Sequence, residues 1–474
     1  MAATREPLTP TAPLAGVSVR EAAGPFPMEA EVLVIGAGAC GLTAALSAAA
    51  GGAEVLVVER DAVPSGSTAL SAGLVPAAGT RWQAAAGVGD DAATLRADIQ
   101  AKAKGLADPA VLDATVMAAG PAVTWLADAH GLPFELIDGF LYPGHSVRRM
   151  HAMPERSGAA LVDRLRAAAE EAGITIVTEA RATALLMDGS RVAGAEIARP
   201  DGAVEPIGCR QLILACNGYG GNRAYLERHI PEILGALWFG HDGNDGTALA
   251  FGEALGADMG HLSGHQGHGS VAHPHGILIT YAAITEGGFQ VNAAGRRFSN
   301  EAAGYSEQAQ HVLAQPGGTA FTIFDARIAE IARQFEDFQR AEAAGAILRA
   351  DTVEALAAAC KVPVQALEET MAATDAARRA GTADNFGRIW TGQPLAPPYC
   401  AVRVTGALFH TQGGLRTDGN ARVLRGGKAL DNLFAAGGAA IGVSGPAASG
   451  YLSGNGLLTA VAMGRVAGQA AAKG

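Results

Sequence analysis

The chain is short of three features, and each shortage excludes a class of protein. Its five cysteines include no CxxC or CxxCH pair, which excludes zinc ribbons, cysteine-motif clusters and attached haem. Aromatic residues make up 5%, too few for a nucleic-acid stacking platform, and the formal net charge of −11 opposes binding to a phosphate backbone. We find no apolar run of about 18 residues and expect no transmembrane segment.

Glycine is abundant instead, with 63 residues, nearly twice the average share. This excess predicts many tight turns and close approaches of the backbone. Residues 1–29 contain proline and alanine but no sustained apolar stretch and no twin arginine. We therefore expect a disordered or surface-wrapped tail rather than a signal peptide, and a cytoplasmic protein.

Apolar segments of strand length alternate with helical patterns over the first half of the chain. Residues 263–405 lose this rhythm and contain charged helical segments such as 328–344. This order predicts an α/β nucleotide-binding domain interrupted by a substrate-covering insertion. The predicted strands are 31–35, 54–59, 175–178, 192–198, 211–216 and 433–436, and the predicted helices are 36–51, 158–171 and 457–471.

Gly36, Gly38 and Gly41 form a GxGxxG motif directly after a predicted strand and at the start of a predicted helix. In this setting the first glycine permits the tight turn, the second lets backbone approach a pyrophosphate, and the third permits close helix–strand packing. The helix N-terminus adds N–H donors and positive potential. Glu59 ends the second strand, where its carboxylate is expected to bind ribose hydroxyls and to repel a 2′-phosphate. A dinucleotide site is therefore predicted, and NADP is disfavoured.

The segment after the second strand, residues 65–73 (SGSTALSAG), suits a loop laid against a pyrophosphate and a flat ring. With four further motifs, the chain resembles the FAD-dependent fumarate reductase and 3-ketosteroid dehydrogenase superfamily. These motifs lie at 214–222 (LACNGYGGN), 291–301 (VNAAGRRFSNE), 410–415 (HTQGGL) and 453–457 (SGNGL). The resemblance implies a Rossmann-like, glutathione-reductase-like FAD-binding domain interrupted by an α+β substrate-capping domain. The implied ranges are a tail at 1–29, FAD-binding pieces at 30–262 and 408–474, and the capping domain at 263–407.

The resemblance also implies how FAD is held. The turn at 454–457 opens the last helix and is expected to aim N–H groups at the flavin pyrimidine, where a helix N-terminus stabilises negative charge. Members with covalent FAD carry a histidine in the loop at 65–73; this chain has none there, so the FAD is expected to be non-covalent. No second dinucleotide motif appears, which leaves a quinone, a redox protein or oxygen as the electron acceptor. The expected FAD-binding residues are Gly36, Gly38, Ala39, Cys40, Gly41, Glu59, Arg60, Ser67, Thr68, Ser71, Ala72, Gly73, Ala182, Ala215, Asn217, Gly218, Asn222, Gly454, Asn455 and Leu457.

Two positions depart from the fumarate reductases of this superfamily. Those enzymes carry a proton-donating arginine four residues after the Asn-Glu pair and a carboxylate-binding arginine before the last Gly-Asn turn. This chain has Tyr305 and Tyr451 at those positions. A tyrosine cannot replace a bidentate guanidinium, but its phenol hydrogen-bonds a ketone oxygen and its phenolate removes a proton from carbon. The 3-ketosteroid dehydrogenases carry tyrosines at matching positions. Because an unperturbed phenol has a pKa of about 10, the base needs neighbouring donors or positive charge.

The predicted activity is therefore dehydrogenation α,β to a ring ketone, in a 3-ketosteroid or a 4-oxocyclohexanecarboxylate-type substrate, with hydride transfer to the flavin. Tyr305 is favoured as the base, with Tyr451 and His410 on the carbonyl, because the counterpart of Tyr305 in fumarate reductases moves a proton. The spacing of Tyr451 and Ser453 resembles the Δ4-type enzymes, in which such a serine helps pass the proton. Ser453 also fits a helix N-cap. The alternatives are a fumarate- or enoate-type reductase and a non-catalytic flavoprotein.

Two histidine-bearing segments have no settled role. Residues 144–151 (GHSVRRMH) contain two arginines that fit an anionic substrate tail, a contact with the capping domain or the pyrophosphate side. Residues 261–275 contain five histidines, whose spacing matches no metal template. We expect no metal site and prefer a loop that lines the cleft.

Overall fold

The computed structural model describes residues 16–139, 141–390 and 392–474, which divide into two compact units. Of the described residues, the larger unit contains 16–229 together with 240–265 and 410–474. The smaller unit contains 230–239 and 266–409. Residues 230–239, which the sequence analysis assigned to the FAD-binding domain, thus cluster with the smaller unit.

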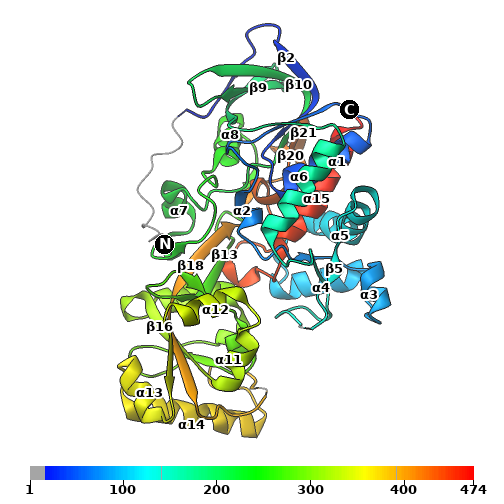
Figure 1. Ribbon diagram of the computed structural model, residues 1–474. Helices are drawn as coiled ribbons and strands as arrows, with labels where there is room; N and C mark the ends of the chain where they lie inside the picture. The colour runs from blue at the N-terminus through cyan, green and yellow to red at the C-terminus, as the bar shows by residue number, and fades with distance from the viewer. Residues whose placement is uncertain (1–15, 140, 391) are drawn as a thin grey trace. The chain divides into compact units, whose positions relative to one another are not determined.

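The larger unit is built on a nine-stranded sheet with the order β1-β8-β9-β10-β2-β3-β7. Figure 1 labels β2, β9, β10, β20 and β21 of this sheet. β21 pairs with β10, and β20 pairs with β21. Strands β10, β2, β3 and β7 pair in parallel, as βαβ connections require. The strands are β1 Ser18–Glu21, β2 Met28–Ile35, β3 Val55–Val58, β7 Thr175–Val177, β8 Arg181–Asp188, β9 Arg191–Ala198, β10 Val204–Leu214, β20 Arg422–Arg425 and β21 Lys428–Ala435.

Both faces of strand β2 are buried. Val32 and Val34 lie in one hydrophobic core, and Leu33 and Ile35 lie in another, because successive side chains of a strand point to opposite faces. α1, α6 and α15 pack on the Val32 side, and α8 packs on the other. The helices of this unit are α1 Ala39–Ala50, α2 Gly66–Ala69, α3 Arg81–Ala85, α4 Ala92–Lys102, α5 Pro109–His130, α6 Gly158–Glu171, α7 Arg223–His229, α8 Thr247–Leu255 and α15 Asn455–Ala471.

Small residues let α1 and α15 approach closely. A Cβ atom at Gly468 of α15 would lie 2.2 Å from the carbonyl oxygen of Ala44 of α1. The alanine-rich sequence of α1 therefore serves a tight helix pair beneath the sheet. Short strands complete the unit: β4 Val75–Pro76, β5 Glu135–Leu136 and β6 Met150–Ala152 form one small sheet, and β12 Met259–Gly260 pairs with β19 Gly414–Leu415.

Helix α5 is the only helix among the described residues that is long and apolar enough to cross a membrane. Half of its apolar window is buried inside the protein, and its Leu112 and Leu126 lie in two hydrophobic cores. We interpret α5 as a core helix. Asp113 and Asp128 interrupt its apolar residues, so the sequence contains no continuous apolar run of this length.

Part of the predicted tail is ordered structure. Residues 1–15 lie outside the described residues, but β1 pairs in parallel with β8, and β2 begins at Met28. The alternation of Val17 and Val19, which pack against the core of the Leu33 face, explains this strand. A strand of four residues leaves too short a pattern to be recognised from the sequence alone.

The smaller unit contains a seven-stranded sheet with the order β14-β13-β18-β16-β15, in which β11 and β17 also pair with β18. The predicted helical segment 328–344 is two helices, α11 and α12, because Phe335 between them has an extended backbone. The strands are β11 Leu237–Trp238, β13 His265–Ala272, β14 Ile277–Leu278, β15 Phe289–Val291, β16 Thr319–Asp325, β17 Ile347–Ala350 and β18 Tyr399–Thr411. The helices are α9 Ala282–Thr285, α10 Tyr305–Leu313, α11 Ala326–Ala332, α12 Glu336–Ala343, α13 Val353–Cys360 and α14 Val364–Ala380.

Candidate active site

The GxGxxG turn connects β2 to α1, as the sequence analysis predicted. Gly36 has φ +106°, and a Cβ atom there would lie 2.6 Å from the carbonyl oxygen of Ala215. A Cβ atom at Gly41 would lie 1.8 Å from the carbonyl oxygen of Gly36. Both glycines are therefore required by the turn. Gly38 has only Thr68 Oγ1 near its Cβ position, at 3.5 Å, so this side of the turn is open.

Glu59 braces this turn. Its buried carboxylate accepts hydrogen bonds from the N–H groups of Ala37 at 2.8 Å and Asp61 at 3.0 Å. Each carboxylate oxygen has a second lone pair, so the predicted bond to a ribose hydroxyl stays a prediction. The neighbouring Arg60 forms an ion pair with Asp245 at 3.1 Å, a partner that the sequence analysis did not single out.

The segment 65–73 and the Gly-rich motif at 214–222 meet in the larger unit. The Ser67 hydroxyl accepts hydrogen bonds from the side-chain amides of Asn217 at 3.0 Å and Asn244 at 2.9 Å. Thr68 Oγ1 accepts a hydrogen bond from the N–H group of Ala39, at the start of α1, at 3.0 Å. Predicted FAD-binding residues 150 positions apart therefore lie side by side. Asn244 lies outside every sequence motif described above, so its contact with Ser67 could not be expected.

Other predicted FAD-binding residues have structural contacts of their own. Ser71 donates to the carbonyl oxygen of Thr68 and accepts from the N–H group of Gly73. Asn222 bonds to Asp245 and to the first turn of α7. The side chains of Cys40 and Ala182 lie in the hydrophobic cores, and Leu457 packs against one. A contact from Cys40 or Ala182 to the cofactor would therefore come from the backbone.

The turn at 451–456 leads into α15. Gly454, with φ +85°, is the N-cap residue, and no side chain caps the helix. The interpretation of Ser453 as the N-cap is therefore wrong by one residue, because α15 begins at Asn455 and Gly454 directly precedes it. Ser453 is buried, and its carbonyl oxygen lies 2.9 Å from His145 Nε2.

His410 and Tyr451 meet at the first turn of α15. Their rings pack edge to face, with centroids 5.5 Å apart. The N–H group of Gly456 donates to Tyr451 Oη at 3.4 Å, and a Cβ atom at Gly456 would lie 2.9 Å from His410 Nε2. Burial lowers the pKa of His410 to about 4, so its imidazole is neutral near pH 7. Two neutral polar groups and a helix N-terminus thus lie close together.

Tyr305 belongs to the smaller unit, at the first residue of α10. Its ring stacks on His268, with centroids 5.0 Å apart, and meets Tyr281 edge-on at 5.6 Å. Burial lowers the pKa of His268 to about 3 and raises that of Tyr281 well above its usual value. Tyr281 donates a hydrogen bond to the carbonyl oxygen of Glu301. No local sequence pattern indicates these two partners of Tyr305, because both lie in other elements.

The motif at 291–301 is held by a buried ion-pair network just before Tyr305. Glu301 forms ion pairs with Arg297 and Arg388, both at 2.8 Å, and the Arg388 guanidinium lies 3.8 Å from the centre of the Trp390 ring. These charged residues therefore position the segment that leads to α10. Arg388 carried no sequence signal because it lies far along the chain.

The segment 144–151 is a second buried network. The fully buried Arg149 binds Asp90 at 2.9 Å and also bonds Asp98 and His145. Arg148 donates to the backbone oxygen of Asp138 at 2.7 Å. The suggestion that Arg149 meets an anionic substrate tail is therefore wrong, because buried carboxylates already neutralise its guanidinium.

The histidines at 261–275 do not share one loop, contrary to the preferred interpretation, because residues 265–272 form strand β13 and only His265 and His268 belong to it. Across the described ranges, no three His, Cys, Asp or Glu side chains are grouped to hold a metal ion. His265 interacts electrostatically with His410, whereas His268 stacks on Tyr305. The buried strand pattern of this segment was hidden by its glycine and histidine content.

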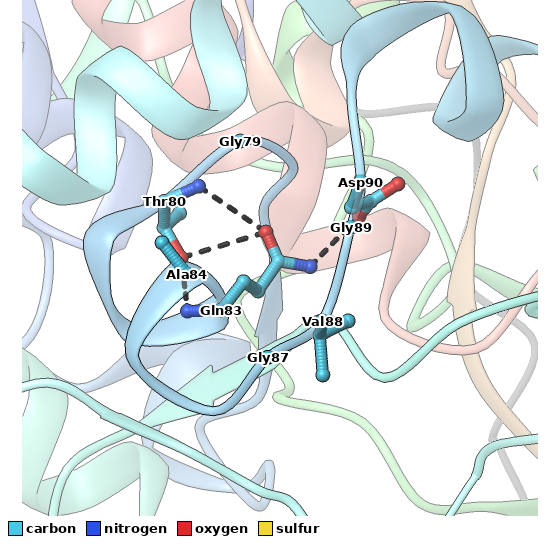
Figure 2. Close-up of a pocket in the computed structure, with 8 residues that line it drawn as sticks. All are labelled: Gly79, Thr80, Gln83, Ala84, Gly87, Val88, Gly89 and Asp90. Atoms are coloured by element: carbon cyan, nitrogen blue, oxygen red, sulfur yellow. Dashed lines mark hydrogen bonds between the residues drawn. The ribbon is translucent and has the colours of Figure 1, made fainter.

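The larger unit contains a pocket of about 410 Å³. Eight residues between Gly79 and Asp90 line it (Figure 2). The side-chain oxygen of Gln83 accepts from the N–H group of Thr80, and its NH₂ group donates to Asp90 at 2.8 Å. Asp90 also binds Arg149. The polar side chains of this pocket therefore serve the fold, and we assign it no ligand.

The FAD binding domain family model matches residues 31–457. The chain belongs to this family. It is 31% identical, over 95% of its length and 76% of the relative, to a Shewanella frigidimarina protein named Probable fumarate reductase Ifc3. It is 25% identical to 4-oxocyclohexanecarboxylate 2-dehydrogenase of Sinomonas cyclohexanicum, over 86% of this chain and 87% of the relative. A solved structure of a Rhodococcus jostii 3-ketosteroid Δ4-(5α)-dehydrogenase matches with a TM-score of 0.78 and 27% identity, over 97% of this chain and all of that one.

The protein is therefore an FAD-dependent oxidoreductase of the fumarate reductase family, and the predicted fold and superfamily are confirmed. The larger unit fits FAD in three ways. The glycine turn is open at Gly38, the N-terminus of α15 has no side-chain cap, and the fully buried Asn455 Oδ1 has no hydrogen-bond partner in the structure. The assignment of individual FAD-binding residues and the non-covalent attachment stay predictions.

Proposed function

We propose that this protein dehydrogenates a ring ketone at the bond α,β to its carbonyl group. The observation that carries the proposal is the pair of neutral groups, Tyr451 Oη and His410 Nε2, at the first turn of α15. An uncharged pair of this kind suits one carbonyl oxygen, whereas a carboxylate is bound by a guanidinium. FAD, when bound, supplies the acceptor for the hydride.

The chain's own residues have separate tasks in this proposal. Tyr451 and His410 bind the carbonyl oxygen and stabilise the negative charge that develops there, which makes the α-proton more acidic. Tyr305 is the proposed base, and Ser453 is proposed to help pass a proton. Stacking on His268 and Tyr281 orients the Tyr305 ring within the smaller unit. Arg297 and Arg388, bound to Glu301, hold the segment before it.

The known relatives support both directions of this chemistry. The ketosteroid and oxocyclohexanecarboxylate dehydrogenases act on ring ketones by name, which favours the proposal. The fumarate reductase has the higher identity, which favours reduction of an unsaturated acid as the second candidate. Tyrosine at both positions 305 and 451 opposes that candidate, because neither side chain pairs with a carboxylate as arginine does.

An anaerobic titration of the flavin-loaded protein tests the proposal. A saturated 3-ketosteroid and 4-oxocyclohexanecarboxylate are added separately, and bleaching of the oxidised flavin band is followed. Bleaching by at least one ketone is expected. In a parallel experiment the chemically reduced protein receives fumarate. Rapid reoxidation by fumarate without bleaching by any ketone would favour the reductase, and no reaction with either would favour a non-catalytic flavoprotein.

A further inference from the structure

A line of buried hydrogen bonds in the larger unit ends on His410. The side-chain amide of Asn455 donates to Ser444 Oγ at 3.0 Å, and Ser444 Oγ donates to Gln412 Oε1 at 2.7 Å. All three side chains are at most 4% exposed. Because water does not reach these three side chains, they hydrogen-bond to one another rather than to solvent.

With the amide orientations of Gln412 and Asn455 in the structure, these bonds assign one role to His410 Nδ1. Because the oxygen of the Gln412 amide accepts from Ser444, its NH₂ group faces His410 Nδ1, at 3.2 Å. An amide NH₂ group only donates, so Nδ1 is the acceptor. The carbonyl oxygen of Thr411, also 3.2 Å from Nδ1, would need a proton on that nitrogen. A proton on Nδ1 would point at the N–H group of Gln412, and two donors repel each other. We therefore assign Nδ1 as the acceptor of the Gln412 bond rather than as a donor to Thr411.

A neutral imidazole carries one ring proton. With Nδ1 as the acceptor, the proton of His410 is on Nε2, the nitrogen that faces Gly456 and lies beside the Tyr451 ring. We propose that Gln412, held by Ser444 and Asn455, is a positioning residue that fixes His410 as the Nε2–H tautomer. His410 is then a hydrogen-bond donor to the substrate and not a base.

The identity of the acceptor, a ketone oxygen, rests on the proposed function, whereas the tautomer does not. The tautomer also decides which step His410 can perform. A histidine that donates from Nε2 and accepts at Nδ1 has no free lone pair for an α-proton. Proton abstraction therefore falls to another residue, consistent with the role proposed for Tyr305.

Nitrogen-15 NMR of flavin-loaded protein with labelled histidine tests the tautomer directly. The His410 signals are assigned by their loss in His410→Gln. In the wild type, Nε2 is expected to show the shift of a protonated nitrogen and Nδ1 that of an unprotonated one. A proton on Nδ1 in the wild type would overturn the inference.

Two variants test the role of Gln412 and Ser444. Gln412→Glu presents only acceptors, so the proton should move to Nδ1, with ketone turnover at least about 10²-fold lower and KM changed far less. Ser444→Ala should give a mixture of tautomers, and Ser444→Thr, which keeps the hydroxyl, should restore the wild-type spectrum. The exposed Gln365→Glu is the control for the same chemical change and should leave the His410 shifts unchanged.

The outcomes separate this inference from the proposed function. If Gln412→Glu and Ser444→Ala both leave the proton on Nε2, Gln412 does not set the tautomer and the inference fails. If the shifts change as expected but no ketone reduces the flavin of the wild type, the tautomer assignment stands and the proposed function fails. Flavin absorbance and a thermal melt of each variant identify any loss of fold.

Discussion

The ring of His410 meets the ring of Tyr451 edge-on, with 5.5 Å between their centroids, at the first turn of α15. The two residues lie 41 positions apart, and the β18 strand end and the α15 turn bring them together. Phenylalanine in place of Tyr451 would keep this ring contact and remove only the oxygen that accepts from Gly456. The chemical role of the oxygen can therefore be separated from packing.

We expect Tyr451→Phe and Tyr305→Phe each to lower ketone turnover by at least about 10²-fold, the usual scale for lost acid–base function. Substrate binding should weaken far less, because the ring is kept. Stopped-flow reduction of the flavin by a good ketone substrate measures both effects. Near-wild-type rates in both variants would mean that the tyrosines only pack.

Arginine at both positions should reverse the preference. The double variant Tyr305→Arg/Tyr451→Arg is expected to bind dicarboxylates more tightly, because a guanidinium pairs with a carboxylate through two hydrogen bonds. Ketone oxidation should be abolished. Inhibition constants for fumarate and succinate, compared with those of the wild type, check the first part. A double variant that still oxidises ketones would contradict the proposed base.

The FAD is expected to dissociate on acid precipitation, because residues 65–73 contain no histidine for a covalent bond. After precipitation with trichloroacetic acid, the yellow colour should stay in the supernatant and the spectrum there should be that of free FAD. Flavin attached to a peptide in the pellet would show that the prediction is wrong.

Loss of the Glu59 carboxylate should weaken FAD binding. Glu59→Ala removes the acceptor for the Ala37 N–H group in the glycine turn and the predicted acceptor for the ribose. The dissociation constant should rise at least about fivefold, since an unpaired buried donor is destabilising by about 1–3 kcal/mol. Glu59→Gln keeps one acceptor oxygen and should show a smaller effect. Fluorescence titration of the apoproteins of the wild type, Glu59→Ala and Glu59→Gln with FAD measures the three dissociation constants. Equal constants would show that Glu59 does not contribute to FAD binding.

The buried ion pair of Arg149 predicts a large stability effect. Arg149→Met leaves the carboxylates of Asp90 and Asp98 without their cation, and breaking a buried pair in this way lowers the free energy of unfolding by about 3–5 kcal/mol. Arg96→Met breaks the exposed pair with Asp113 and should change the free energy of unfolding by less than about 1 kcal/mol. Urea denaturation of both variants makes the comparison. Equal effects would show that the buried network does not stabilise the fold.

Buried neutral histidines predict that stability falls in mild acid. Burial lowers the pKa of His268 to about 3, below the ordinary value of 6.5 that it regains on unfolding. Between these values the unfolded chain binds more protons, so the free energy of unfolding decreases as the pH falls from about 6.5 to 3. His268→Phe, which keeps a ring against Tyr305, should have a shallower decrease. The urea midpoints of the wild type and of His268→Phe are measured from pH 7 to pH 4. An identical decrease of the midpoint with pH in both proteins would contradict the prediction.

The sequence by itself determined the elements whose pattern is local. The continuous apolar run of β2, the glycines at 36 and 41, and the glycine turn before α15 are properties of adjacent residues and of backbone geometry. Their order along the chain was enough to indicate the superfamily, the fold and FAD. Tyr305 and Tyr451, in place of the arginines of fumarate reductases, were recognisable in the same way, because each lies at a set distance from a motif.

Only the tertiary structure decided which side chains touch. Arg149 could bind a substrate or a carboxylate of its own unit, and the approach of Asp90 and Asp98 settled this. The partners of Tyr305 and the Gln412 amide beside His410 were likewise hidden in the sequence. Such contacts join residues far apart or in different elements, and packing selects among partners of equal chemistry. No local pattern records that choice, because it depends on how the whole core is filled.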